Sequence, residues 1–381
     1  MDLHFPRPQL AKDVACAILG RSLFSQPTLF LAAPRRTGKS QFINRDVIPA
    51  LQALGACVIY LDLWKDQDAD PAELIAHAIA RELASRQGFM ARTAAAIGLQ
   101  RVSIHGVEFD LSDVGRAAGA SLSDALQALH EAAQAPIVLI IDEAQHVIAK
   151  PDAMPVMFAL KSARDTMNIH GRKLGLIMSG SDRDKLLRLV TGNAAPFLGS
   201  DITELPHLGE DFVKHTAGLL ALERPGWNFD NAQLQDAFQK FAHQPEFFLR
   251  AVQLASAAFA GPAADFHERL GLAADAFEAA RAADYVATYK AMTRIQQAML
   301  SRVLQGAGLF TQDALIEYGA ARGGTKSQPL SPGTARALLN QLREQSPPII
   351  WRSAHGEYAT EDSGMTVWYH ALVRQKAWPP A

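Results

Sequence analysis

Two short segments of this 381-residue chain contain residue types that suit phosphate chemistry. The first, Ala33-Pro-Arg-Arg-Thr-Gly-Lys-Ser40, places a glycine, a lysine and a hydroxyl side by side. Backbone N–H groups of such a loop and of a following helix surround phosphate oxygens, and the helix dipole favours negative charge there. The second segment, Asp142-Glu143, directly follows the apolar run Ile137–Ile141. Together the two segments predict a site for a nucleoside triphosphate and a metal ion.

The loop residues have distinct expected roles. Gly38 permits close approach of the backbone to phosphate, whereas Ala33 stands where such loops usually have their first glycine. Lys39 is expected to reach the β and γ phosphates and to act in catalysis, and Ser40 is expected to ligate a magnesium ion. The residues of this loop that we expect to bind the nucleotide are Ala33, Pro34, Arg35, Arg36, Thr37, Gly38, Lys39, Ser40 and Gln41.

The carboxylates and a nearby serine complete the predicted catalytic site. Asp142 is expected to hold magnesium through water, and Glu143 to orient and deprotonate the attacking water. A third buried run, Leu174–Ser179, leads to a further hydroxyl at Ser181. Either Ser179 or Ser181 is expected to polarise the water or the γ phosphate, and we select Ser181. An open alternative is that both serines only cap the helix that follows.

Strand and helix patterns alternate in the first 205 residues, which predicts a parallel α/β sheet with helices on both faces. The expected strands, in chain order, are Thr28–Ala32, Cys57–Asp62, Ile137–Ile141, Leu174–Ser179 and Ile202–Leu205. We predict the sheet order 5-1-4-3-2 for these strands. The expected helices are Ser40–Leu54, Pro71–Ser85, Ser121–Ala133 and Met154–Asn168. The alternating segment Val102–Phe109, centred on His-Gly, predicts a hairpin inserted between the second and third strands.

Composition limits the class of protein. Nearly half of the residues are hydrophobic and 20% are charged, which suits a globular chain of two or three domains. Its only cysteines, Cys16 and Cys57, lie in apolar segments, as expected of buried thiols in a reducing compartment. No apolar run approaches the roughly 18 residues of a membrane span, so we expect a cytoplasmic protein without membrane contact.

The alternation of strands and helices stops after the predicted sheet, and we therefore divide the chain into three domains. We assign 1–208 to the nucleotide-binding core and 209–288 to a helical lid subdomain, because Ala-rich helical patterns replace the strands there. Residues 289–381 show the order helix, helix, helix, hairpin, which is typical of a winged helix. Within it, Ser331 as N-cap and Pro332 at the first helical position mark the start of the third helix.

Positive charge is concentrated near the C-terminus. Residues 290–381 contain 10 Lys and Arg against 6 Asp and Glu, although the whole chain has a net charge of -2. Arg336 and Arg343 lie seven residues apart on the third helix, hence on one face, and Arg352 lies near the wing. Duplex DNA is therefore one expected partner of 289–381. A packing or protein-interaction role for the same region stays open.

The combined motifs resemble those of the AAA+ superfamily and, more narrowly, of the STAND and archaeal-type ATPases. The resemblance rests on Phe5-Pro-Arg7, the loop Ala33–Ser40, the run Ile-Ile-Asp-Glu-Ala-Gln145 and Met-Ser-Gly-Ser181. It implies a P-loop ATPase fold with ATP and Mg²⁺ as ligands. It also implies that Arg7 lies near the adenine and that a lid segment ending in Pro245 lies near the phosphates, although this segment reads His-Gln-Pro where the family has Gly-x-Pro.

These features favour an ATP-hydrolysing molecular switch whose nucleotide state is coupled to the C-terminal winged helix. The alternative is a DNA-binding protein whose ATP site is a slow or inactive clamp, and a metabolic kinase is a weaker third hypothesis. A nucleotide-dependent oligomer is also expected from the resemblance, with Arg183 and Arg188 as candidates for an arginine finger. Arg35 and Arg36 either contact phosphate or a neighbouring subunit, or are simply solvated.

Overall fold

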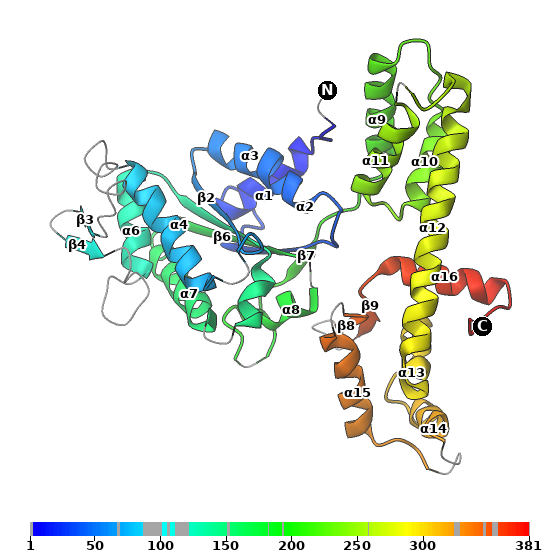
Figure 1. Ribbon diagram of the computed structural model, residues 1–381. Coiled ribbons are helices and arrows are strands. Elements are labelled where there is room, and N and C mark those ends of the chain that lie inside the picture. The colour runs from blue at the N-terminus through cyan, green and yellow to red at the C-terminus, as the bar shows by residue number, and fades with distance from the viewer. Residues whose placement is uncertain are drawn as a thin grey trace. The chain divides into compact units, whose positions relative to one another are not determined.

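The structure is a computed structural model that describes most of the chain (Figure 1). The described residues are 3–66, 69–86, 101–104, 107–110, 122–150, 153–181, 183–192, 194–257, 259–323, 328–345, 348–352 and 357–380. The chain divides into two compact units, one formed by His4–Pro206 and the other by His207–Ala381 with Met1–Leu3. Within the described ranges, none of the helices has both the length and the apolar character that crossing a membrane requires.

A parallel sheet of five strands forms the centre of the first unit. Its strands are β1 (Thr28–Ala32), β2 (Cys57–Asp62), β5 (Ile137–Asp142), β6 (Leu174–Gly180) and β7 (Ile202–Glu204). The order β2-β5-β6-β1-β7 confirms the predicted order 5-1-4-3-2. Every residue of β5 and β6 is buried, because helices cover both faces of the sheet. This arrangement is the P-loop AAA+ fold.

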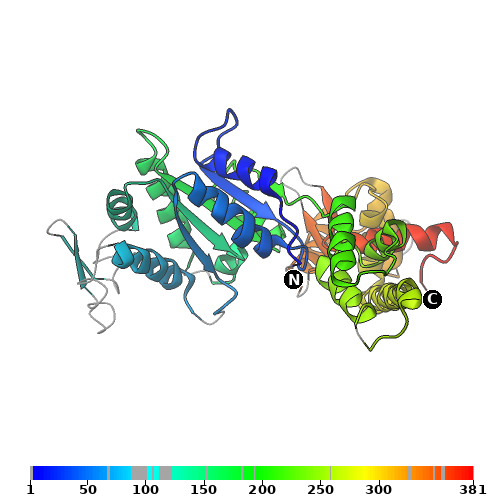
Figure 2. The same ribbon diagram turned by 90° about the horizontal axis from the view of Figure 1, so that it is seen from above.

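Helices form a layer on each side of this sheet (Figures 1 and 2). They are α1 (Pro8–Ile18), α2 (Lys39–Phe42), η1 (Ile43–Val47), α3 (Ile48–Ala53), α4 (Pro71–Arg86), α6 (Leu122–Ala133), η2 (Ala144–Ala149), α7 (Met154–Met167) and α8 (Arg183–Arg188). The π-helical turn η1 joins α2 to α3, so the helix predicted over Ser40–Leu54 is continuous. α1 and α3 pack on the face of the sheet that presents Leu31, Val138 and Ile177. This packing fixes the helix whose first turn carries Lys39 and Ser40.

The predicted hairpin between the second and third core strands is confirmed. β3 (Arg101–Ile104) and β4 (Val107–Asp110) pair antiparallel, with Val102 opposite Phe109. The His-Gly turn between them lies outside the described residues.

The second unit is mostly helical. Its elements are α9 (Glu210–Glu223), α10 (Asn231–Lys240), α11 (Pro245–Ala255), η4 (Ala263–Asp265), α12 (Phe266–Ala291), α13 (Arg294–Leu304), α14 (Gln312–Ala321), α15 (Pro332–Glu344), β8 (Ile350–Arg352), β9 (Tyr358–Thr360) and α16 (Ser363–Arg374). The 26-residue helix α12 runs through position 288, where we had placed a domain boundary. The division of this unit into a lid and a winged helix therefore stays a proposal.

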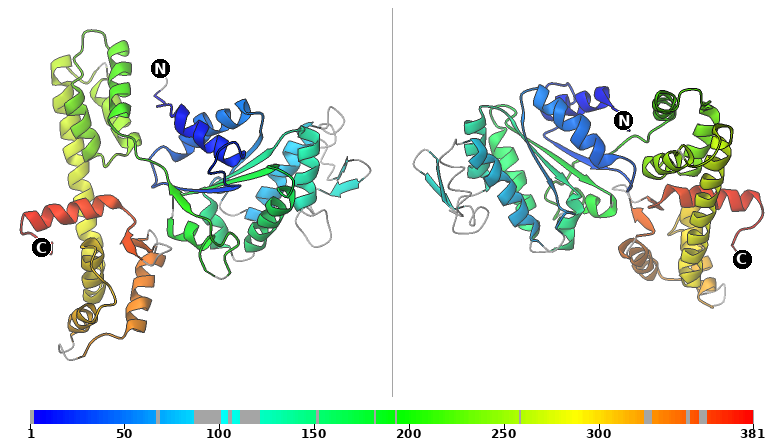
Figure 3. Two further views of the ribbon diagram at one scale, coloured as in Figure 1. Left: turned by 180° about the vertical axis from the view of Figure 1, so that it is seen from behind. Right: turned by 45° about the horizontal axis from the view of Figure 1, so that its top comes forward.

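Figure 3 shows α13, α14, α15 and the β8–β9 hairpin in the C-terminal part of this unit. Their apolar side chains contribute most of a separate hydrophobic core. Met299, Tyr318 and Leu339 are fully buried in it. As predicted, the Ser331 hydroxyl caps α15 by accepting the Thr334 backbone N–H at 3.1 Å. The order of three helices and a hairpin is observed, and α16 follows as an element that we did not predict.

Candidate nucleotide site

The loop Ala33–Ser40 connects the carboxyl end of β1 to the first turn of α2. Its start is tied to the neighbouring strand, because the Ala33 backbone N–H donates to the Gly180 carbonyl at 3.1 Å. Its middle is closed by the Thr37 hydroxyl, which donates to the Pro34 carbonyl at 2.7 Å. Gly38 has φ of +86°, a left-handed conformation that side chains rarely adopt, directly before the helix. The loop therefore has the local structure that a phosphate-binding loop requires.

Lys39 lies at the centre of the predicted site. Its Nζ lies 2.6 Å from Asp142 Oδ1 and 2.5 Å from Glu143 Oε1. The side chain is only 5% exposed, so these are buried charge-assisted contacts. The Ser179 hydroxyl also lies 3.5 Å from Nζ. The structure thus brings together the lysine of the loop and both carboxylates, which are about a hundred residues away in sequence.

The predicted metal ligands Ser40 and Asp142 are in direct contact. The Ser40 hydroxyl donates to Asp142 Oδ2 at 2.7 Å, and the Tyr60 hydroxyl donates to the same oxygen at 3.1 Å. Magnesium prefers oxygen ligands and keeps several waters, so a hydroxyl and a carboxylate this close fit its requirements. No cluster of three or more His, Cys, Asp or Glu side chains that suits a metal occurs in the described part of the chain. A magnesium ion here would therefore depend on Ser40, Asp142, phosphate oxygens and water.

Glu143 occupies an unusual backbone position. Its φ and ψ are 55° and 41°, in the left-handed region that a residue other than glycine adopts only at a cost. Its backbone N–H donates to Asp142 Oδ1 at 3.0 Å. Its Oε2 accepts a hydrogen bond from the Ser181 hydroxyl at 2.8 Å and another from Gln145 Nε2. The side chain of the predicted base is therefore held on both oxygens.

The electrostatics keep both carboxylates ionised. Burial raises the pKa of Asp142, but the charge and hydrogen bond of Lys39, with hydrogen bonds from Ser179 and Ser40, outweigh burial and leave this pKa below its usual value. Burial likewise raises the pKa of Glu143, and Lys39, Ser181 and Gln145 together lower it below its usual value. At neutral pH Asp142 is thus able to ligate a cation, and Glu143 is able to accept a proton.

Ser179 and Ser181, the two serines considered as catalytic groups, contact different carboxylates. Ser179 is fully buried and its hydroxyl donates to Asp142 Oδ1. Ser181 donates to Glu143. This division associates Ser179 with the metal ligand and Ser181 with the predicted base.

The sequence-predicted adenine contact Arg7 also lies beside the helix that follows the loop. Its guanidinium carbon is 4.5 Å from the centroid of the Phe42 ring, and its Nη1 donates to the Pro206 carbonyl at 3.2 Å. Burial lowers the pKa of Arg7. Pro245 is the first residue of α11 in the other unit, and His243, two residues before it, has φ of 54°. Its role in nucleotide binding stays a proposal.

The loop arginines differ in their surroundings. The Arg35 guanidinium carbon lies 4.6 Å from the ring centroid of Trp64, whose ring lies 4.7 Å from that of His146. Arg36 has φ of 67°. Arg183, a candidate arginine finger, forms an ion pair with Glu204 in the same unit.

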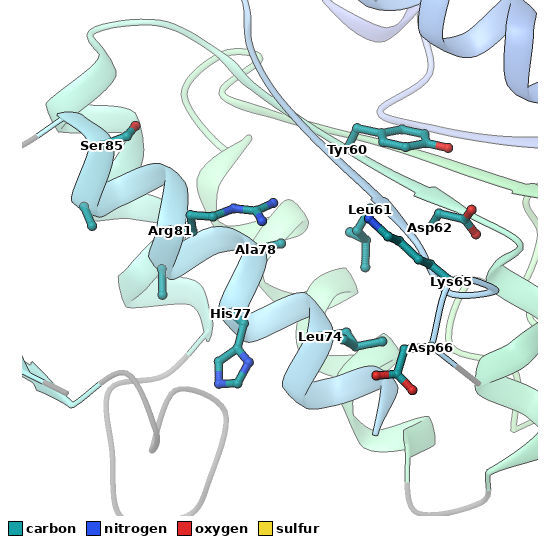
Figure 4. A pocket seen from close by; sticks show the side chains of 12 residues that line it. Tyr60, Leu61, Asp62, Lys65, Asp66, Leu74, His77, Ala78, Arg81 and Ser85 are labelled. Carbon is teal, nitrogen blue, oxygen red and sulfur yellow. The ribbon is translucent and has the colours of Figure 1, made fainter. Parts of the chain in front are cut away.

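A pocket of about 840 Å³ adjoins the site at the end of β2. It lies between β2 and α4, and Figure 4 shows Arg81 extending from α4 toward Leu61. Tyr60 and Asp62 line this pocket, and Tyr60 also contacts Asp142, so it joins the pocket to the candidate metal ligand. The loop Ala33–Ser40 does not line it.

Among the described residues near the site, the sequence did not predict the contacts of Tyr60, Trp64, Gln145 and His146. Tyr60 and Gln145 are polar residues inside or next to an apolar strand, which is the one signal that the sequence offers for them. Which neighbour they contact depends on strands that are distant in the chain.

The comparisons with known proteins agree with this geometry. Residues 22–188 match a protein family described as an AAA domain. No curated protein matches the sequence.

Solved structures with the same fold include a Walker-type ATPase of Pyrococcus abyssi, with 16% identity, a TM-score of 0.51, and coverage of 94% of this chain and 95% of that one. The ADP form of the ORC2 protein of Aeropyrum pernix is similar with 14% identity, a TM-score of 0.54, and coverage of 99% and 97%. At these identities the likeness shows the fold. Residues 22–188 are thus similar to an AAA domain, and the sheet and helices around it have the P-loop AAA+ fold of these structures.

Proposed function

We propose that this protein is an ATP-binding and ATP-hydrolysing molecular switch that uses Mg²⁺. The observation that carries the proposal is the buried contact of Lys39 with both Asp142 and Glu143, beside the Ser40 to Asp142 hydrogen bond. A structure of the ORC2 protein of Aeropyrum pernix, with 13% identity and a TM-score of 0.52, is described as ADPNP and ADP complexes, which supports an adenine nucleotide as ligand. The name of the Pyrococcus Walker-type ATPase supports hydrolysis.

The proposed binding contacts follow from the loop. Backbone N–H groups of Ala33–Ser40 surround the phosphates, and Lys39 neutralises the β and γ oxygens. A bound Mg²⁺ would supply further charge neutralisation at those oxygens. Ser40, and Asp142 through water, would hold this ion, and Arg7 would contact the adenine.

Hydrolysis requires a base that removes a proton from water. In the proposed step the water oxygen bonds to the γ phosphorus, the bond from that phosphorus to the bridging oxygen breaks, and ADP and phosphate result. The proton of the water passes to the Glu143 carboxylate, which its lowered pKa keeps ionised beforehand. Ser181, which donates to Glu143, orients that carboxylate.

The rest of the proposed switch concerns the second unit. We assign 209–288 to a lid, with Pro245 near the phosphates, and 289–381 to a winged helix that responds to the nucleotide. The STAND subtype, a nucleotide-dependent oligomer and a cytoplasmic location are part of the same proposal.

A DNA-binding protein with a slow ATP clamp is the second candidate. It is favoured by the excess of basic residues in 290–381 and by the exposure of Arg336 and Arg352. The two functions differ in turnover. Phosphate release should be measured with and without duplex DNA, at saturating ATP and magnesium. Steady release without DNA supports the switch, release only with DNA supports a DNA-coupled ATPase, and no release in either case rejects hydrolysis and leaves the clamp.

A further inference from the structure

Gln145 lies two residues after Glu143 and is almost completely buried, with 3% of its surface exposed. Its Nε2 donates to Glu143 Oε2 and lies 3.3 Å from the Ser181 hydroxyl oxygen. A buried amide of this kind is costly unless its hydrogen bonds are made, so the contact with Glu143 is a strong constraint on both side chains.

The orientation of the Gln145 amide follows from its partner. An ionised carboxylate only accepts hydrogen bonds, so the nitrogen of the amide must face Glu143 and the oxygen must face away. The oxygen, Oε1, has no hydrogen-bond partner among the described residues. If the amide were turned around, Gln145 Oε1 would face Glu143 Oε2, and these two hydrogen-bond acceptors cannot bond to each other.

Gly180 on β6 makes room for this arrangement. A Cβ added to Gly180 would collide with Gln145 Oε1 and would lie 3.3 Å from its Cδ. Gly180 also accepts the Ala33 N–H at the start of the phosphate-binding loop. A glycine is needed here because of close approach, since its φ is not in the left-handed region. The position of Gln145 is thus set by the neighbouring strand.

The two oxygens of Glu143 have different partners. Oε1 contacts Lys39 Nζ at 2.5 Å, whereas Oε2 accepts from Ser181 at 2.8 Å and from Gln145. Lys39 is also the residue proposed to bind the phosphates, so ATP competes with Glu143 Oε1 for Lys39. The contacts of Oε2 come from Ser181 and Gln145, and Gln145 is not among the residues expected to bind the phosphates.

We propose that Gln145 is a positioning residue for Glu143. Together with Ser181 it holds Glu143 Oε2, and Glu143 Oε1 is the atom that receives the proton of the attacking water when Lys39 engages a phosphate. This proposal rests on the proposed ATPase function and specifies its regulation. The base becomes available only with nucleotide present, because Lys39 otherwise occupies the same oxygen.

Replacing the amide tests the proposal. Gln145→Leu keeps a similar volume and removes the hydrogen bonds, so kcat should fall by roughly 10- to 100-fold, as when a partner that orients a reacting group is removed. KM for ATP should change little, because the loop is untouched. A merely structural defect would also weaken ATP binding, so a lowered kcat with an unchanged KM is the result that identifies a positioning role.

Gly180→Ala is an independent perturbation, since the added methyl group displaces the Gln145 side chain without changing it. It should lower kcat and leave KM for ATP unchanged, as Gln145→Leu does. Gly218→Ala is the matched control, because nothing lies within 4 Å of its Cβ position and its activity should be unchanged. Circular dichroism and ATP titration of each variant separate misfolding from an effect on the base.

Glu143→Gln, measured in parallel, separates the proposed ATPase function from the proposed role of Gln145. If it hydrolyses ATP at the wild-type rate, the base assignment fails and the proposal fails with it. If it is inactive while Gln145→Leu and Gly180→Ala keep the wild-type kcat, the ATPase function stands and the role of Gln145 is wrong. A fall in kcat with an equal loss of ATP affinity would also overturn the positioning role.

Discussion

The predicted nucleotide residues and the predicted DNA-binding arginines differ in how the structure arranges them. Lys39, Asp142 and Glu143 converge within hydrogen-bonding distance in the interior of the first unit. In the second unit, Arg336 lies over Phe310 at 5.9 Å and Arg352 lies over Tyr358 at 5.6 Å. Each of these two arginines thus lies over a different aromatic ring.

The difference shows which functional residues a fold positions and which it does not. Residues at the carboxyl ends of parallel strands must meet, because the sheet brings those ends to one edge. Exposed arginines on one helix lie on a common face, but this does not bring their guanidinium groups together. Each side chain contacts an aromatic ring or an amide near its own backbone. Burial and convergence therefore favour the nucleotide site as the functional centre.

The largest expected effect concerns the base. Glu143→Gln should lower ATP hydrolysis by about 100-fold or more while ATP and magnesium still bind, because the variant loses the proton acceptor and keeps the metal ligand Asp142. Phosphate release measures hydrolysis, and calorimetry measures binding. The exposed α6 residue Glu131, changed to Gln, is the control and should hydrolyse ATP normally. Equal rates in Glu143→Gln and wild type would contradict the base assignment.

A smaller effect is expected for the lysine of the loop. Lys39→Ala should weaken ATP binding by about 30-fold, the equivalent of about 2 kcal/mol for a charge-assisted hydrogen bond. The fold should be retained, because the lysine side chain faces the site. Calorimetric titration with ATP gives the affinity, and circular dichroism checks the fold. An unchanged affinity would remove Lys39 from the nucleotide site.

The sequence predicted those parts of the molecule that follow from local pattern. Buried apolar runs such as Ile137–Ile141 predicted strands, and Ser331-Pro332 predicted a helix start, because strand burial and helix capping act over a few residues. The strand order was predicted as that of a P-loop sheet, and Lys39 and Asp142-Glu143 were expected to meet because both motifs follow the carboxyl ends of parallel strands.

The unpredicted contacts depend on tertiary neighbours. Gln145 contacts Glu143 in a conformation for which Gly180 on β6 leaves space. The sequence around Gln145 does not indicate that Gly180 lies next to it. Tyr60 reaches Asp142 only because β2 pairs with β5. The extent of α12 was also unpredicted, since helical spacing continues across 288 without a capping signal.

A test of the second region uses all three arginines. If Arg336, Arg343 and Arg352 contact phosphates, replacing them with Ala should weaken duplex binding at every sequence and lower the salt slope by roughly 3, about one unit per lost contact. The structure shows a competing bond, because Arg343 Nη1 donates to Asn340 Oδ1 at 3.0 Å. Fluorescence anisotropy with labelled duplex at several salt concentrations measures the slope.

The control for that experiment removes the same charge elsewhere. Lys12, Lys214 and Arg250 are exposed and lie outside 289–381, so their replacement by Ala should leave the slope unchanged. An equal loss in both triple variants would mean that binding follows net charge alone. If the wild type shows no salt-sensitive binding at about 50 mM salt, where such contacts are strongest, the region is better explained as a protein-docking module.

The smallest expected effect concerns the edge of the nucleotide site. Trp64 is 42% exposed and its ring lies beneath the Arg35 guanidinium, a contact worth about 0.5 to 1 kcal/mol at exposed positions. If Arg35 turns to a phosphate when ATP binds, it must leave the ring, and Trp64 fluorescence should change. The difference between wild type and Trp64→Phe isolates this signal, because the other four tryptophans lie beyond residue 206. Since one contact replaces another, Arg35→Ala should weaken ATP binding by less than about 5-fold. A Trp64 signal that ATP leaves unchanged would mean that Arg35 stays on the ring and supports the nucleotide site only through the shape of the loop.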